Sequence, residues 1–181
     1  VLNGAADVSA EERAAYLKRA NQLRRQEGED VIEVDADMET PEVAVTLSDA
    51  RFADLAQREQ FILTITENGY GKRTSSYEYR VTGRGGSGIV NIITSARNGQ
   101  VVVSFPIEEA DQLMLMTNSA KLIRCGVHDV RIAGRNTQGV TLFKVDGQEK
   151  VVSAVRIDGS MIASDEEEEE ISPAAGEAET E

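Results

Sequence analysis

Apolar and polar residues alternate in short runs over residues 60–157, which is the pattern of half-buried β-strands. Turn signals separate the runs, including Asn-Gly at residues 68–69 and 98–99 and Asp-Gly at residues 146–147. The pattern predicts eight strands: Phe61–Thr66, Tyr70–Thr74, Ile89–Thr94, Val101–Pro106, Leu113–Thr117, Lys121–Arg124, Val140–Val145 and Lys150–Ile157.

Two helices are predicted before the strands, because apolar residues there recur every three or four positions. The first begins at Ser9, where Ser9 and Glu12 have the spacing of a capping box, and is expected to end near Gly28. The second covers residues 49–59 behind the cap residue Ser48. Basic residues line the first helix, and we interpret them as a solvated face in preference to a DNA contact: Arg13, Lys18, Arg19, Arg24 and Arg25.

The stretch Tyr79–Val90 recurs 51 residues later as Val130–Thr141. Tandem repeats of about 50 residues with four short strands each are typical of propeller-type blades. The predicted fold is therefore mainly β, with two four-stranded blades and an α-helical insertion before them. The residues that align without a gap are Arg80 with Arg131, Gly83 with Gly134, Arg84 with Arg135 and Gly88 with Gly139.

Composition divides the chain into four parts. The first contains the two helices and an acidic linker at Glu29–Glu42, and the last contains six consecutive acidic residues, which repel one another and favour disorder. The parts are residues 1–59 (helical insertion and linker), 60–109 (first blade), 110–157 (second blade) and 158–181 (disordered acidic tail). Because the chain begins within a pattern and lacks an initiator Met, we interpret it as a fragment of a longer protein.

Charge is distributed unevenly over these parts. The chain has a formal net charge of −13, made up of −7 over residues 1–59, +4 over residues 60–157 and −10 over residues 158–181. A basic region inside an acidic chain favours a polyanionic partner such as nucleic acid, although a β domain with a solubilising tail is the alternative. No apolar run approaches the roughly 20 residues that span a bilayer, and a single cysteine fits a reducing compartment, so we expect a cytoplasmic protein without a membrane partner.

Residues suited to catalysis or metal binding are sparse. Cys125 and His128 supply two ligands at most, whereas a structural zinc site needs about four. Their surroundings single out no nucleophile, and Gly83–Gly88 lacks the Lys-Ser/Thr end of a phosphate-binding P-loop. We therefore expect no enzyme activity and no metal site in this fragment alone.

Basic residues recur at equivalent places in the two repeats, which suits a partner with regularly spaced phosphates. The candidate DNA contacts are Lys72, Arg73, Arg80, Arg84, Lys121, Arg124, Arg131 and Arg135. Loop glycines permit positive φ and close approach to phosphate: Gly83, Gly85, Gly86, Gly88, Gly134 and Gly139. The alternative is that the glycines only shape turns and the arginines pair with Glu78 or Asp129. No base-reading element is evident, so little sequence preference is expected.

Residues 60–157 resemble the C-terminal domain of the DNA gyrase A subunit. The resemblance rests on ILTITENGYGKRT at Ile62–Thr74, on EYRVTGRGGSG at Glu78–Gly88 and on GRNTQGV at Gly134–Val140. It implies a β-pinwheel, a propeller-like disc of four-stranded blades whose basic outer rim wraps double-stranded DNA. The family's gyrase A box, a Gln-Arg-Arg-Gly-Gly-Lys-Gly type motif, has only degenerate counterparts here, at Gly83–Gly88 and Gly134–Gly139.

The resemblance further implies a part in a bacterial, ATP-dependent type IIA topoisomerase that introduces negative supercoils. Its partners would be the remainder of the A subunit together with the B subunit in an A2B2 heterotetramer at the nucleoid, and ATP and Mg²⁺ would be used by other parts. The catalytic tyrosine would lie outside this chain, so none of its four tyrosines is assigned that role: Tyr16, Tyr70, Tyr77 and Tyr79.

Two alternatives to this interpretation remain open. One is the related but more degenerate domain of the topoisomerase IV A subunit, and the other is a non-catalytic propeller-type module whose basic rim docks an acidic protein.

Overall fold

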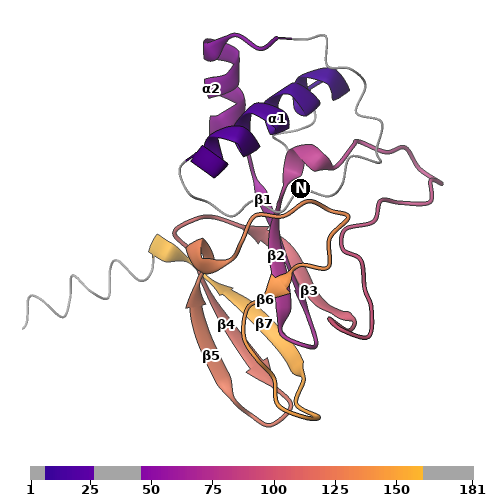
Figure 1. Ribbon diagram of the computed structural model, residues 1–181, viewed down its shortest axis with the longest axis vertical. Helices are drawn as coiled ribbons and strands as arrows, with labels where there is room; N and C mark the ends of the chain where they lie inside the picture. The colour runs from indigo at the N-terminus through magenta and orange to yellow at the C-terminus, as the bar shows by residue number, and fades with distance from the viewer. Residues whose placement is uncertain (1–6, 27–45, 161–181) are drawn as a thin grey trace, which may run out of the picture.

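The structure is a computed structural model that describes residues 7–26 and 46–160, and these are mainly β (Figure 1). Helices α1 (Ala10–Gln26) and α2 (Asp49–Arg58) precede the strands. The strands are β1 (Phe61–Thr66), β2 (Tyr70–Ser75), β3 (Val101–Ile107), β4 (Gln112–Thr117), β5 (Leu122–Gly126), β6 (Val140–Thr141) and β7 (Val151–Ile157). Short 3₁₀ turns η2 (Ser76–Glu78) and η3 (Val127–Asp129) follow β2 and β5. The prediction of a mainly β fold with a helical insertion before the strands is confirmed. The prediction of four strands in each blade is not, because within the described residues one sheet has four strands and the other has three.

The strands form two antiparallel sheets, in the orders β3-β1-β2-β6 and β5-β4-β7. In the first sheet Phe61 is paired with Ser75, and 51 residues later Gln112 is paired with Gly126. The register shifts after Ile65 in the first sheet and after Met116 in the second, again 51 residues apart. The repeat found in the sequence is therefore present in the strand pairing, down to the same irregularity.

Strand β6 crosses from the second repeat into the first sheet, where Val140 and Thr141 are paired with Gly71 and Tyr70 of β2. This observation corrects two strand predictions. The strand predicted over residues 140–145 is limited to β6, and residues 89–94, predicted as a strand, form none. Ile89 and Val90 are the counterparts of Val140 and Thr141, but within the described residues no strand edge is paired with them.

An aliphatic core lies between the two sheets. The first sheet contributes Leu63 and Ile65, and the second contributes Leu113 and Leu115, all fully buried. At about 25 cal/mol per Å² of apolar surface removed from water, such side chains supply most of the favourable free energy of folding.

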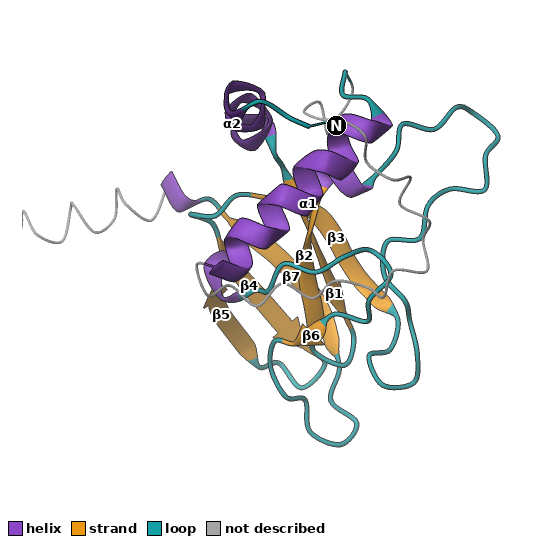
Figure 2. Ribbon diagram, turned by 45° about the horizontal axis from the view of Figure 1, so that its top comes forward, coloured by secondary structure: helices purple, strands orange, loops and turns teal. Residues whose placement is uncertain are grey.

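The helical insertion packs against the end of the first sheet where β1 begins (Figures 1 and 2). The Tyr16 ring of α1 lies 5.0 Å from the ring centroids of both Phe52 and Tyr77. The Tyr77 hydroxyl of η2 donates to the Leu55 carbonyl at 2.8 Å. The insertion is thus docked on the blade rather than tethered to it. The predicted end of α1 at Gly28, the acidic linker and the tail beyond residue 160 lie outside the described residues.

Both helix starts have the predicted caps: the Glu12 N–H donates to the Ser9 hydroxyl and the Arg51 N–H to the Ser48 hydroxyl. The basic residues of α1 are more engaged than the solvated-face interpretation allowed. Arg19 pairs with Asp49 at 2.7 Å, Arg24 pairs with Glu59 at 2.5 Å, and Arg13 donates to the Tyr79 carbonyl. These contacts fix α1 to α2 and to the blade.

Candidate nucleic-acid interface

The loop at residues 80–90 projects from the first repeat, and residues 80–88 are all exposed. Gly85 and Gly88 have φ of 78° and 77°, in the left-handed region that side chains disfavour. A Cβ at either position would have no heavy atom within 4 Å. These glycines are therefore needed for the backbone conformation and not to make room for a neighbouring group. Arg80 and Arg84 lie on this exposed loop, where a phosphate could reach them.

Both ends of this loop are firmly anchored. The Tyr79 hydroxyl donates to the Asn91 side-chain oxygen, and the Asn91 amide donates to the Thr64 hydroxyl at 2.7 Å. Burial raises the pKa of Tyr79 to about 12, so this hydroxyl keeps its proton at physiological pH. On the other side, the Arg135 guanidinium donates to the Val90 carbonyl at 2.9 Å. The loop is therefore free at its tip and held at its base.

The corresponding loop of the second repeat, residues 131–139, packs against β2 of the first. The Lys72 ammonium donates to the carbonyls of Gly134 at 2.5 Å and Arg135 at 2.8 Å and to the Thr137 hydroxyl at 3.3 Å. At Gly139, where φ is 75°, a Cβ would lie 2.8 Å from the Gly71 oxygen. This loop therefore requires glycine for a close approach between two backbones.

Lys72 is 0% exposed and Arg73 is 4% exposed, which corrects their prediction as DNA contacts. Burial lowers the pKa of Lys72 to about 8. The Arg73 guanidinium donates to the Val130 carbonyl at 2.5 Å and to the Glu109 carboxylate. Lys72 directs its donors at the loop of the second repeat, and Arg73 directs its donors at Val130 of the second repeat and at Glu109. Both buried side chains are therefore engaged within the protein and neither is available to phosphate.

Glu78 makes a different contact from the arginine pairing considered as an alternative. Its carboxylate accepts the main-chain N–H of Arg135 at 2.8 Å, and burial raises its pKa. The Arg135 guanidinium is half-buried and lies 5.9 Å from the centroid of the Tyr79 ring. Arg135 thus mainly links the two loops, and its side chain is less exposed to DNA than that of Arg84.

Three further candidates lie exposed on the second repeat, at Lys121, Arg124 and Arg131. Lys121 pairs with Glu149 at 2.8 Å, and the Arg124 guanidinium donates to the Gln112 side chain. The Lys121 ammonium, followed by two hydroxyl donors, lowers the pKa of Glu149 to about 2. Gly83 and Gly86 belong to the exposed first loop, and Gly134 offers its carbonyl to Lys72.

The exposed basic residues that were missed in the sequence include Arg97 and Lys144. The Arg97 guanidinium lies 5.3 Å from the Tyr70 ring centroid, and its Nε donates to the Tyr70 hydroxyl at 3.1 Å. Their counterparts in the other repeat are Gln148 and Ile93, which are not basic. Comparing the two repeats therefore gave no reason to select either position.

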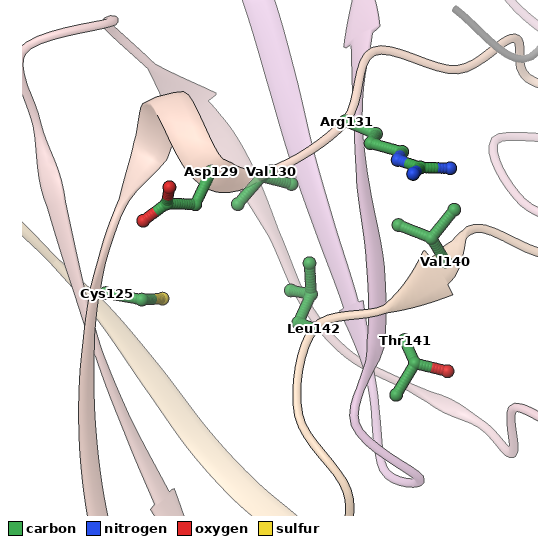
Figure 3. A pocket seen from close by; sticks show the side chains of 7 residues that line it. All are labelled: Cys125, Asp129, Val130, Arg131, Val140, Thr141 and Leu142. Carbon is green, nitrogen blue, oxygen red and sulfur yellow. The ribbon is translucent and has the colours of Figure 1, made fainter. Parts of the chain in front are cut away.

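A cavity of about 310 Å³ separates β5 and η3 from the segment that contains β6 (Figure 3). Its walls are Cys125, Asp129, Val130, Arg131, Val140, Thr141 and Leu142. Burial raises the pKa of the Cys125 thiol, which disfavours the reactive thiolate. Within residues 7–26 and 46–160, no three His, Cys, Asp or Glu side chains gather where they could hold a metal ion. In the same ranges, no helix combines the length and apolar character needed to cross a bilayer.

Comparison with known proteins identifies the repeats. A family model described as the DNA gyrase C-terminal domain, beta-propeller, matches residues 60–105 and 111–158, one segment in each repeat and together just over half of the chain. The A subunit of DNA gyrase from Rickettsia bellii (strain RML369-C) is 47% identical over 163 residues, covering 90% of this chain and 17% of that protein. Its counterpart from Granulibacter bethesdensis (strain ATCC BAA-1260 / CGDNIH1) is 46% identical over 154 residues, covering 81% and 16%.

Solved structures have the same fold. A structure of the DNA gyrase A C-terminal domain superposes with a TM-score of 0.52 at 24% identity, covering 56% of this chain and 35% of that one. The C-terminal domain of DNA topoisomerase IV gives a TM-score of 0.50 at 17% identity, covering 61% and 36%. The chain spans less than a fifth of the curated relatives' length. On the strength of the match in both repeats and of the sequence identity to these relatives, the chain belongs to the family of DNA gyrase C-terminal domains.

Proposed function

We propose that this region binds and wraps double-stranded DNA for a DNA gyrase. The observation that carries the proposal is the loop at residues 80–90, an exposed, glycine-shaped loop that presents Arg80 and Arg84 with no packing around its tip. It lies in a β region with a net charge of +4 within an acidic chain. Arg97, Arg131 and Lys144 supply further exposed positive charge.

The proposed role of the whole protein follows from the relatives, which are A subunits of DNA gyrase. In that role, the A and B subunits form an A2B2 heterotetramer in the bacterial cytoplasm, at the nucleoid. The enzyme uses ATP and Mg²⁺ through other parts and introduces negative supercoils. We assign no catalytic residue to this chain, whose contribution is to hold the DNA.

The contacts proposed are with phosphate. Long, flexible guanidinium side chains on an open loop suit the negatively charged backbone, whereas reading base edges requires an element shaped to enter a groove. Binding should therefore weaken steeply with salt and depend little on sequence.

The test is to measure the affinity of the chain for a DNA duplex over a range of salt concentrations. Replacing Arg80 and Arg84 with Ala should reduce the slope of log affinity against log salt by about 1.8, at about 0.9 per phosphate contact. A control with Lys18→Gln and Arg58→Gln removes two positive charges from the insertion and should leave the slope nearly unchanged. Equal slopes for the loop variant and the wild type would refute contact through this loop.

A protein-docking role is favoured by a separate observation. Met116 and Leu122 form a cross-strand pair on the face of the second sheet that also holds Val155, and all three are exposed, at 42%, 66% and 53%. We propose that this apolar face packs on the rest of the A subunit. The comparison with topoisomerase IV rests on fold alone, whereas the curated relatives reported above are gyrase subunits, so gyrase remains the favoured assignment.

A further inference from the structure

The residue just before each repeat loop is held by an arginine, and the two arginines come from different parts of the chain. In the second repeat, the Val130 carbonyl accepts from the Arg73 guanidinium of β2 at 2.5 Å. The counterpart of Val130 is Tyr79, whose carbonyl accepts from the Arg13 guanidinium at 2.9 Å. Arg13 belongs to the helical insertion. The insertion therefore supplies to the first loop the contact that the neighbouring strand supplies to the second.

Arg13 lies on a part of helix α1 that is itself held in place by buried contacts. Tyr16, one turn further along α1, is only 2% exposed and donates through its hydroxyl to the Glu59 carboxylate at 2.8 Å. Its ring packs edge-on against Tyr77 of η2, the turn that directly precedes Tyr79 and lies beside α1 (Figure 1). Helix α1, turn η2 and Tyr79, the residue before the loop, thus form one continuous packed unit.

The insertion has no equivalent in the second repeat. Tyr77 corresponds there to His128, whose side chain is 69% exposed, and Phe61 corresponds to Gln112. At these two positions, aromatic residues thus occur only in the repeat that carries the helices. The loop that the helices brace is the exposed one with Arg80 and Arg84, whereas the loop of the second repeat is fixed by burial against β2.

We propose that the helical insertion sets the DNA affinity of the first loop, with Arg13 as the positioning residue that fixes the loop's base through the Tyr79 carbonyl. This inference rests on the proposed function. Arg13 directs its guanidinium at a carbonyl and need not touch DNA. It acts by limiting where Arg80 and Arg84 can lie, so that less ordering is required when the loop meets phosphate.

The test compares Arg13→Gln with wild type in the 181-residue chain, by measuring duplex affinity over a salt series. Loss of a hydrogen bond with a charged donor is expected to lower affinity about fivefold at each salt concentration, with the slope unchanged because no phosphate contact is removed. Arg13→Lys keeps a charged donor and should recover most of the affinity. Hydrogen exchange at the Tyr79 amide, which donates to the Ser76 carbonyl at 3.1 Å, should quicken in Arg13→Gln while the amides of β1 keep their protection.

Lys18→Gln is the matched control, because it removes one positive charge from an exposed position of the same helix. It should change affinity less than about twofold. Arg13→Gln should also have no further effect when Arg80 and Arg84 are already Ala, since the loop then has no contact left to position. Additive losses in that background, or a lower salt slope for Arg13→Gln alone, would overturn the proposal by showing that Arg13 binds phosphate itself.

The two proposals fail in different ways. If the wild-type chain shows no salt-dependent DNA binding, the proposed function fails, while the hydrogen-exchange comparison still tests whether Arg13 braces the loop. If the wild type binds as expected and Arg13→Gln binds equally well with unchanged exchange at the Tyr79 amide, the positioning role alone is refuted.

Discussion

The Glu78 carboxylate accepts a hydrogen bond from the main-chain N–H of Arg135 at 2.8 Å, across a sequence separation of 57 residues. This contact joins the end of η2 in the first repeat to the loop of the second. Asp129, the counterpart of Glu78, has an exposed side chain instead. The acidic residue at this repeat position therefore links the two repeats in one case and is exposed on the surface in the other.

Replacing Glu78 with Ala should lower the free energy of unfolding by about 1–3 kcal/mol, because the Arg135 N–H loses its acceptor. Glu78→Gln keeps an acceptor oxygen and should cost less. Urea unfolding followed by circular dichroism measures both. Asp129→Ala is the matched control and should have little effect, and an equal loss for Asp129→Ala and Glu78→Ala would contradict a link between the repeats at Glu78.

Lys72 should make the protein more stable as pH rises from about 7.5 to about 9.5. The pKa of Lys72 is about 8 when folded, against an ordinary value of 10.5, so in this interval the unfolded chain binds more protons than the folded one. The free energy of unfolding should therefore rise with pH, by about 2 kcal/mol from this group. Above a pH of about 10 the trend should reverse, because burial raises the pKa of Tyr16, Tyr77 and Tyr79.

The variant Lys72→Met isolates that contribution, since it removes the titrating group and keeps a side chain of similar length. Its unfolding free energy should vary much less over the same interval, whatever its value at neutral pH. A pH profile parallel to that of the wild type would show that another group is responsible.

The glycines at equivalent loop positions should differ in their tolerance of a methyl group. Gly139→Ala places a Cβ 2.8 Å from the Gly71 oxygen at positive φ and should cost about 2–4 kcal/mol. Gly88→Ala has the same φ problem but open space around it, so about 1 kcal/mol is expected. Thermal unfolding of both variants measures the difference, and similar losses would argue against packing of the second loop on β2.

Residues 77 and 128 are at equivalent positions in the two repeats, and exchanging their residue types should show how far docking of the insertion depends on Tyr77. Tyr77→His introduces the residue found in the second repeat and should destabilise the protein by about 2–3 kcal/mol, because it removes a buried ring and its bond to the Leu55 carbonyl. The reverse change, His128→Tyr, lies at an exposed position and should alter stability by less than about 0.5 kcal/mol. Chemical denaturation with a limited-proteolysis assay of α1 distinguishes detachment of the helices from global loss of structure.

The repeated sheets could be predicted because strand and turn signals are local. The run at Phe61–Thr66 and the Asn-Gly turn after it place β1 and β2 without reference to the rest of the chain. Partner choice is not local: Ile89 and Val90 have the same pattern as Val140 and Thr141, yet only the second pair has a strand to join in the described residues.

The candidate site was harder to predict than the fold, since charge in a sequence does not reveal burial. Lys72 and Arg73 lie in a strand like rim residues, but the loop of the second repeat covers them. Arg80 and Arg84 are exposed as expected, although whether they bind DNA stays a prediction. A signal for the docked insertion was present, in aromatic Phe61 and Tyr77 where the other repeat has Gln112 and His128.

The crossing of β6 has a consequence for the order in which the protein is made. The ribosome completes β2 at Ser75, but the strand that closes its outer edge ends at Thr141. The first sheet therefore stays open while most of the second repeat is still being translated, whereas a self-contained blade would close before its neighbour existed. Of the two sheets in the described residues, neither has all of its strands until synthesis has passed Thr141.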